Sequence, residues 1–280
     1  MKINWKKRER MQVCQEGDVV YLKYPSLEET GVVIHGFSSR LGGVSQGIYA
    51  SMNLSFSRGD DKEAVLENYR RIAKAIGFQW ESVVASDQTH TANVRVVGNE
   101  DKGCGLIKPR SYRDVDGMIT NVPQVTLATY YADCVPLYLV DPVKKAVGLS
   151  HSGWKGTVGK IGKATVEAME REYGTDPKDL TVAIGPSICQ DCYEVSEDVI
   201  EEFRRAFSRE LWDRLFYQKE NGKYQLDLWE ANRQIFLEAG VEAGKIALPG
   251  LCTCCNPDFL FSHRASKGKR GNLAAFLALK

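Results

Sequence analysis

The sequence lacks an excess of charge of either sign. Lys and Arg number 37, Asp and Glu number 36, and the formal net charge is +1. A balanced chain offers no positive field to a phosphate backbone, so we expect no nucleic-acid partner. Long hydrophobic runs are also lacking, because the longest apolar-rich stretch, 125–140, is interrupted by Asp133 and is too short to span a bilayer. We therefore expect no membrane partner.

The first residues, MKINWKKRERM, are basic but are not followed by an apolar stretch. This argues against a signal peptide and predicts a cytoplasmic location. Histidine is scarce, with four residues, whereas cysteine is not, with eight. In a chain of this length without a leader, reduced thiols that are buried or bind metal are expected rather than a disulfide framework.

Strand-like and helix-like patterns interleave along the chain. The strand patterns are 32–37, 83–85, 94–97, 126–131, 135–140, 146–150 and 181–184, and the helical patterns are 61–76, 157–173, 197–207 and 228–239. The order has no regular βαβ rhythm, which predicts an α/β fold, with α+β as the alternative. We expect one domain over 1–280 with a mixed sheet flanked by helices, and residues 1–30 as an N-terminal extension packed on it.

Three residues with metal-binding side chains stand at the ends of predicted strands. His90 ends a polar turn, Cys134 lies between two β runs, and His151 ends a buried run and opens a Gly-rich loop. Strand ends bring side chains together at one edge of a sheet. Zinc takes nitrogen and sulfur ligands and keeps a position open in catalytic sites, so we predict a zinc site here, with copper as the alternative ion.

The same atoms allow a second interpretation. Cys134 could be a thiolate nucleophile with His151 as its base. Such a dyad does not require His90, whereas a zinc site does, so His90 discriminates between the two. Asp133 faces away from Cys134 if the segment is a strand, but reaches the pocket if the chain turns, and is our candidate for a general acid or base or for orienting a substrate hydroxyl.

Five further cysteines lie in two groups. Cys189 and Cys192 have ordinary CxxC spacing, whereas Cys252, Cys254 and Cys255 form a compressed, irregular group. We therefore expect buried or half-buried thiols near the main site, and the sequence leaves open whether they bind a second metal.

Three cationic residues occupy polar or Gly-rich segments outside the helical patterns. Arg40 lies in SSRLGG, Lys155 follows Trp154, and Arg264 lies in FSHR. Arginine beside exposed backbone amides is a common binding site for phosphate or carboxylate, so we predict that these three residues bind substrate or phosphate.

Seven ordered segments carry a family resemblance: SSRLGGVSQGIYASMNLSF, ASDQTHTANV, DVDGMITN, TYYADCVPLYLVD, GLSHSGWKGT, AIGPSICQDCYEV and CTCCNPDFLFSHR. They resemble the YfiH-type laccase-domain family, whose members have been called polyphenol oxidases and are now regarded as multifunctional purine nucleoside phosphorylases. The match runs from about residue 32 to the end of the chain.

The resemblance implies a zinc-binding α/β fold with His90, Cys134 and His151 as ligands. It implies phosphorolysis of adenosine, inosine and methylthioadenosine, with an adenosine deaminase activity, so that purine nucleosides and phosphate are the expected partners. Two arginines of the family match Arg40 and Arg264. The sequence departs from the family at Ala265, where a second basic residue usually follows.

Three other classes of protein are consistent with these residues. A copper-dependent polyphenol oxidase would share the ligand types, although one cysteine and two histidines fall short of a multicopper centre. A Cys–His thiol hydrolase would use Cys134 and His151. A non-enzymatic interaction module would hold a structural zinc. We expect a monomer or a small homo-oligomer.

Overall fold

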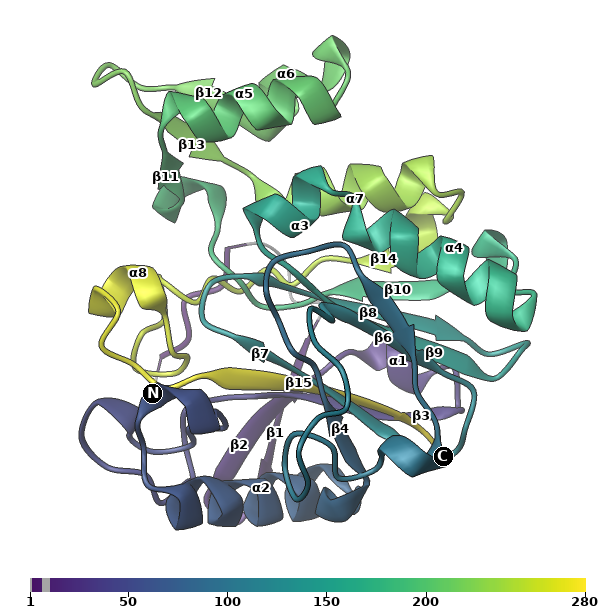
Figure 1. The fold of residues 1–280 in the computed structure, drawn as a ribbon. Coiled ribbons are helices and arrows are strands. Elements are labelled where there is room, and N and C mark those ends of the chain that lie inside the picture. Colours follow the sequence, from purple (N-terminus) through teal and green to yellow (C-terminus); the bar gives the residue numbers. More distant parts are fainter. Residues whose placement is uncertain (1, 7–10) are drawn as a thin grey trace.

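The computed structural model describes residues 2–6 and 11–280, and most of its strands form two six-stranded sheets (Figure 1). The first sheet has the order β1-β2-β3-β15-β7-β4: β1 (Gln12–Glu16), β2 (Val19–Lys23), β3 (Val33–Ser38), β15 (Leu273–Leu279), β7 (Thr126–Tyr131) and β4 (Val83–Ala85). The second has the order β14-β10-β8-β9-β6-β5: β14 (Ile246–Ala247), β10 (Thr181–Ile184), β8 (Val135–Asp141), β9 (Ala146–Ser152), β6 (Gly117–Thr120) and β5 (Val94–Val96).

Both sheets mix parallel and antiparallel pairs, which confirms the predicted α/β class with mixed sheets flanked by helices. The sequence predicted one sheet where the structure has two large ones. All residues of β8 and β9 are buried, as expected for runs too apolar to alternate. The apolar segment at the end of the chain forms β15, which lies between β3 and β7.

The two sheets pack face to face around a shared core. Phe37, Leu127 and Tyr131 of the first sheet lie in one buried cluster with Tyr138 and Leu149 of the second. Such stacking places two inner sheet faces about 10 Å apart and buries them without a helix between. The site described below lies where the chain crosses from β7 in one sheet to β8 in the other.

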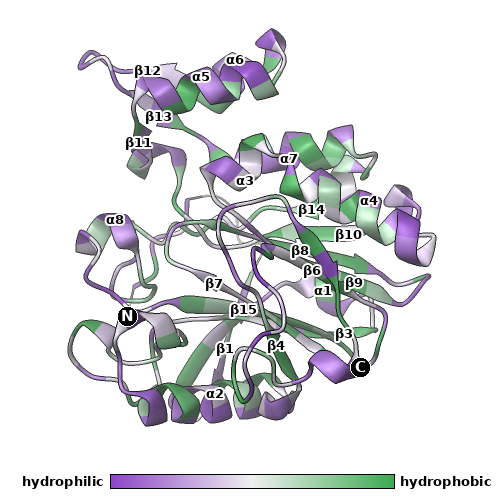
Figure 2. Cartoon of the chain, viewed as in Figure 1, coloured by the Kyte–Doolittle hydropathy of each residue, from purple (hydrophilic) through white to green (hydrophobic). Residues whose placement is uncertain are grey.

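Helices cover the two outer faces, and their apolar stripes face the sheets (Figure 2). The α-helices of the described residues are α1 (Pro25–Glu28), α2 (Lys62–Ile76), α3 (Trp154–Val158), α4 (Ile161–Tyr173), α5 (Glu197–Ala206), α6 (Trp212–Leu215), α7 (Leu228–Glu238) and α8 (His263–Ser266). The first sheet is covered by α2, and the second by α4 and α7. A small third sheet, β11 (Glu194–Val195), β13 (Tyr224–Leu226) and β12 (Phe216–Gln218), stands at one end with α5 and α6.

Capping explains why α2 agrees closely with its predicted range. The side chain of Asp61 accepts from the N–H of Ala64, and Gly77 ends the helix at φ 99°. The predicted helix 157–173 is instead two helices. The chain breaks after Gly159, and Lys160 takes a left-handed conformation at φ 54° before α4 begins.

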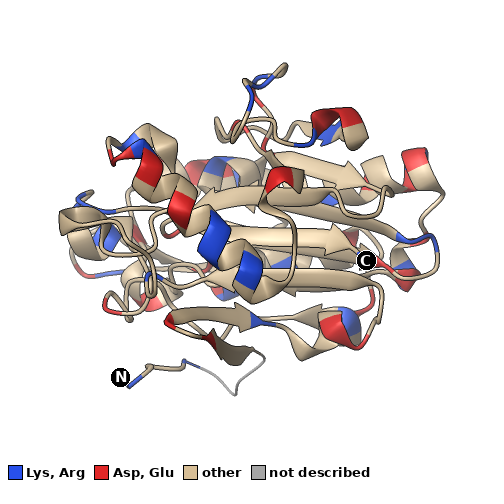
Figure 3. Cartoon of the chain, turned by 90° about the horizontal axis from the view of Figure 1, so that it is seen from below, with Lys and Arg blue, Asp and Glu red and all other residues tan. Residues whose placement is uncertain are grey.

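The N-terminal region 1–30, predicted as an extension, contributes β1, β2 and α1 to the described structure, whereas residues 1 and 7–10 lie outside it. Within the described residues, no helix has the length and apolar composition needed to cross a membrane. Seen from below, cationic and anionic residues are interspersed on helices and connections (Figure 3).

One buried histidine gives the fold a specific pH dependence. His35 of β3 is 1% exposed, and its Nε2 accepts the backbone N–H of Tyr24 at 2.8 Å. Burial lowers the pKa of His35 to about 4, whereas an unfolded histidine titrates near 6.5. The neutral form is favoured in the folded state, so this stability is fully present above about pH 6.5 and decreases as the pH falls toward 4.

We therefore predict that the free energy of unfolding of His35→Gln depends less on pH below about pH 6.5 than that of the native protein. The native free energy of unfolding should lose about 3 kcal/mol between pH 7 and pH 4 through His35 alone, and the variant should lack this component. Urea unfolding of both proteins at several pH values measures the difference. Equal pH slopes in the two proteins would contradict the assignment.

Candidate metal centre

Three side chains, one from a loop, one from a turn between strands and one from a strand end, converge at one end of the two-sheet sandwich. His90 lies in the loop between β4 and β5, Cys134 lies between β7 and β8, and His151 is the penultimate residue of β9. Their ligand atoms all lie within 4.8 Å of one another, and Cys134 Sγ is 4.0 Å from His90 Nε2. We call these residues the metal trio. They form a candidate metal centre, as the sequence predicted; their role as ligands stays a prediction.

A buried carboxylate, that of Asp116, organises two of the three positions. Its Oδ1 lies 2.8 Å from His151 Nδ1, which leaves Nε2 of that ring for the centre. The same carboxylate accepts the backbone N–H groups of Thr89, His90 and Thr91 and the hydroxyl of Thr91. A carboxylate behind a ligating histidine fixes its tautomer and ring orientation. Asp116 therefore sets both the direction of His151 and the course of the loop carrying His90.

The electrostatics of the centre favour a thiolate that faces a protonated imidazole. Burial would lower the pKa of His151, but the facing Cys134 and the bond to Asp116 raise it to about 9, so a cation at the trio would displace that proton. Burial alone would raise the pKa of Cys134, but the facing His151 and His90 lower it to about 6. Burial likewise opposes ionisation of Asp116, yet the bond from His151 and the backbone donors hold its pKa at about 2. A thiolate is the form that binds metal or attacks as a nucleophile. The centre is therefore consistent both with a zinc site and with a Cys134–His151 dyad.

The backbone is strained at or beside two of the trio positions. His90 has φ 67° and Asp133, adjacent to Cys134, has φ 90°. Non-glycine residues in such conformations cost about 1–3 kcal/mol each and persist where neighbouring contacts over-determine them. Gly153 is required nearby for another reason, since a Cβ there would lie 2.8 Å from His90 Cδ2 and 3.2 Å from Cys134 Sγ.

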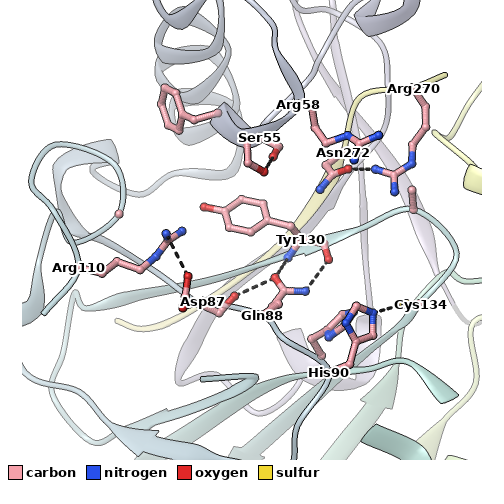
Figure 4. A pocket seen from close by; sticks show the side chains of 16 residues that line it. Ser55, Arg58, Asp87, Gln88, His90, Arg110, Tyr130, Cys134, Arg270 and Asn272 are labelled. Carbon is pink, nitrogen blue, oxygen red and sulfur yellow. Dashed lines mark hydrogen bonds and ion pairs between the residues drawn. The ribbon is translucent and has the colours of Figure 1, made fainter. Parts of the chain in front are cut away.

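Two hollows meet at the metal trio. The first, of ≈ 410 Å³, contains His90, Cys134 and His151 and three arginines, Arg58, Arg110 and Arg270; we call it the arginine hollow (Figure 4). The second, of ≈ 250 Å³, also contains His90 and Cys134 and is lined in addition by Thr89, Asp133, Gly153, Trp154, Lys155, Ile188, Tyr193 and Leu228; we call it the aromatic hollow. His90 and Cys134 therefore lie on the boundary between an arginine-lined space and an aromatic one.

The arginine hollow has a concentration of positive charge that the sequence analysis missed. Burial, and then the charge of Arg58, lower the pKa of Arg270 to about 10. Among the described residues, the buried Nε of Arg270 has no hydrogen-bond partner. Arg58 and Arg270 are far apart in the chain, and no local pattern marks either of them. Figure 4 shows both side chains on the same side of the hollow.

Both predicted phosphate-binding arginines make their contacts elsewhere. Arg40 donates to the carbonyls of Ala50 and Pro257, and it lines neither hollow. Arg264 donates to the carbonyls of Cys192 and Glu194 and lies over the ring of Tyr193. Neither arginine lines one of the two hollows, and their predicted role in binding phosphate stays a prediction.

The other two predicted residues do line the aromatic hollow. Lys155 extends over the ring of Trp154. The chain turns at Asp133, which is the condition under which this residue was expected to reach the pocket. Its carboxylate accepts the Thr253 hydroxyl at 2.6 Å and the Arg264 N–H at 2.7 Å.

The fold and the site define a two-sheet α/β protein with a candidate His–Cys–His centre, and comparison with known proteins assigns its family. The family model described as "Multi-copper polyphenol oxidoreductase laccase" matches residues 34–280, and the chain belongs to this family. "Purine nucleoside phosphorylase YlmD" of Bacillus subtilis (strain 168) is 39% identical over 253 residues, 89% of each chain.

Two further comparisons agree. "Adenosine deaminase RL5", from an unknown prokaryotic organism, is 35% identical over 233 residues, which are 82% of this chain and 88% of that protein. The crystal structure of YlmD from Geobacillus stearothermophilus has a TM-score of 0.90 at 35% identity and covers 97% of this chain and 99% of that one. These findings confirm the family and the fold class inferred from the sequence.

The geometry predicts that Asp116→Asn weakens metal binding while the chain stays folded. An amide cannot accept the ring N–H, three backbone N–H groups and a hydroxyl as the carboxylate does. We expect a 10- to 100-fold lower metal affinity, measured by competition with a chromophoric chelator. The exposed Asp114, two residues away, provides the control Asp114→Asn. Unchanged affinity in the Asp116 variant would contradict the positioning role.

Proposed function

We propose that the protein is a zinc-dependent purine nucleoside phosphorylase that acts on adenosine, inosine and methylthioadenosine and has adenosine deaminase activity. One observation carries the proposal: His90 and Cys134 line both hollows, so a cation held by the trio would stand between an anion site and an aromatic site. The printed names of the relatives, phosphorylase and deaminase, support the reaction class.

The donor set of the trio fits zinc. Two imidazole nitrogens and one thiolate within 4.8 Å are ligands that zinc binds in catalytic sites, and the exposure of His90 opens the centre to the hollows. When bound, zinc would supply a Lewis acid and an open coordination position at the boundary of the two spaces. Copper shares these ligand types, and metal analysis decides between the ions.

We assign phosphate to the arginine hollow. Guanidinium groups bind phosphate oxygens in bidentate fashion. Burial and, after it, repulsion from Arg58 lower the pKa of Arg270, and an anion between the two arginines would relieve that repulsion. The buried Nε of Arg270 adds a donor that no described residue uses. Arg110 is less available because it is 3.5 Å from Asp87 and donates to the carbonyl of Ala85.

We assign the nucleoside to the aromatic hollow. Trp154 and Tyr193 offer aromatic surface for a purine, and Leu228 and Ile188 complete an apolar wall. Asp133 and Lys155 supply polar groups for ribose hydroxyls or the base. In phosphorolysis the glycosidic C1′–N bond breaks, a C1′–O bond to phosphate forms, and the purine nitrogen gains a proton. Placing the two reactants on either side of the trio brings the reacting atoms together.

The cytoplasmic location, the monomeric or small oligomeric state and the role of Asp133 as general acid remain predictions. A thiol hydrolase using Cys134 is the second candidate function, because the pKa of Cys134 is lowered to about 6 and His151 faces it.

Substitution of His90 separates the two candidates. We predict that His90→Ala loses the metal of the trio and lowers inosine phosphorolysis by at least about 100-fold, since the open coordination position is lost. Metal per chain is measured by elemental analysis, and free hypoxanthine is followed with and without phosphate. Activity retained after metal loss, yet abolished by a thiol alkylator, would favour the Cys134–His151 dyad.

The assignment of phosphate gives a second test. We predict that Arg270→Gln raises the KM for phosphate about 10- to 100-fold, because a charge-assisted hydrogen bond is lost, and leaves the KM for inosine nearly unchanged. Trp154→Ala should raise the KM for inosine and leave the KM for phosphate nearly unchanged. Steady-state kinetics with each substrate varied in turn measures both.

Arg40→Lys is the matched comparison, since the sequence also marks Arg40 as a phosphate ligand. Its side chain is held by backbone carbonyls, so its replacement should affect stability more than the KM for phosphate. A rise in that KM confined to the Arg40 variant would overturn the assignment to the arginine hollow.

A further inference from the structure

Four cysteines that the proposed function does not use lie together beside the metal trio. Their Sγ atoms, from Cys189, Cys192, Cys252 and Cys255, all lie within 4.8 Å of one another. We call them the thiol cluster. The spacing also corrects our interpretation of the sequence: Cys252 and Cys255 form a second CxxC pair, which the intervening Cys254 made look irregular.

The backbone around the cluster has the form expected of two metal-binding CxxC turns. The N–H of Cys192 donates to the carbonyl of Cys189 at 3.1 Å and closes the first turn, and the N–H of Asn256 donates to the carbonyl of Thr253 at 3.2 Å in the second. The N–H of Cys189 also donates to Cys252 Sγ at 3.2 Å, which joins the two turns. Backbone donors aimed at sulfur stabilise thiolates, the form in which cysteine binds metal.

The distances suit one tetrahedral ion rather than a larger cluster. Zinc–sulfur bonds of about 2.3 Å place the four sulfurs of a tetrahedron about 3.8 Å apart. The Cys192–Cys255 and Cys189–Cys255 sulfurs are 3.4 and 4.0 Å apart. Cys189 and Cys252 are buried and the other two are half-buried, which corresponds to a closed site. Lys6, paired with Asp191 at 3.0 Å, adds a positive charge next to it.

We propose that the thiol cluster binds a second, structural zinc ion, separate from the trio and beyond the proposed catalytic function. The ion replaces the thiol protons, which are released on binding, and closes the link between the segments 189–192 and 252–255.

The link braces the segment that carries Cys134. Thr253, inside the second CxxC pair, donates its hydroxyl to the Asp133 carboxylate at 2.6 Å. Ile188, next to the first pair, donates its N–H to the carbonyl of Asp133 at 3.0 Å. A structural ion would therefore hold the turn at Asp133 from two sides and stabilise its left-handed conformation, which has a φ of 90°.

The test counts metal ions in the full-length protein. We expect two zinc ions per chain in the native protein, one in His90→Ala, one in Cys192→Ser and none in the double variant. Cys254→Ser is the matched control, because its thiol is adjacent to the cluster but not part of it, and it should keep two. Cys192→Ser should also unfold at a lower temperature than Cys254→Ser.

A second measurement covers the case in which Cys192→Ser does not fold. Cobalt-loaded His90→Ala should show the intense sulfur-to-cobalt charge-transfer absorption of four thiolates, and all eight thiols of the denatured, metal-free chain should react with an alkylating agent.

If two of the eight thiols fail to react, they form a disulfide, and the proposal is overturned. Iron in place of zinc would also overturn it, and so would a zinc content that Cys192→Ser leaves unchanged. Failure of phosphorolysis with two zinc ions bound would reject the proposed function and leave this site standing.

Discussion

The organisation of the site depends on one carboxylate. Asp116 is fully buried, yet it accepts from the loop of Thr89, His90 and Thr91 and from the ring of His151. Each charge-assisted bond contributes about 1.5–3 kcal/mol, which opposes the desolvation of the carboxylate and the strain of the left-handed backbone at His90. The hydrogen bonds that compensate the buried charge therefore also fix the positions of the two imidazoles that a metal would need.

The third position, Cys134, is held from the opposite side. Its neighbour Asp133 is fixed by Thr253 and by the N–H of Arg264, so segments distant in the chain determine the direction of the thiolate. The strain at the site is therefore compensated by two separate groups of contacts. This arrangement places a thiolate and two imidazoles between a space rich in arginine and one rich in aromatic rings, which is the physical basis for assigning anion and nucleoside to different sides.

Much of this could be predicted from sequence because local chemistry determined it. The buried runs 126–131 and 135–140 are strands whatever their partners. His90, Cys134 and His151 were found because each has a metal-binding side chain in or beside a turn that borders a β-rich run. Asp116 was not found, because its function comes from the distant loop that it binds. Arg58 and Arg270 were missed for the same reason. The pairing of Cys252 with Cys255 was not recognised because Cys254 between them obscured a regular spacing. The central position of β15 likewise depends on tertiary pairing alone.

Nitrogen NMR of the histidine rings tests the central claim most directly, since the chain has only four histidines. With zinc bound, we expect a proton on His151 Nδ1, held by Asp116, and zinc-dependent shifts of His151 Nε2 and of His90, while the signals of His35 stay unchanged. A proton on His151 Nε2 in the zinc-loaded protein, or rings that do not respond to zinc, would contradict the claim that Asp116 presents these imidazoles to a shared ion.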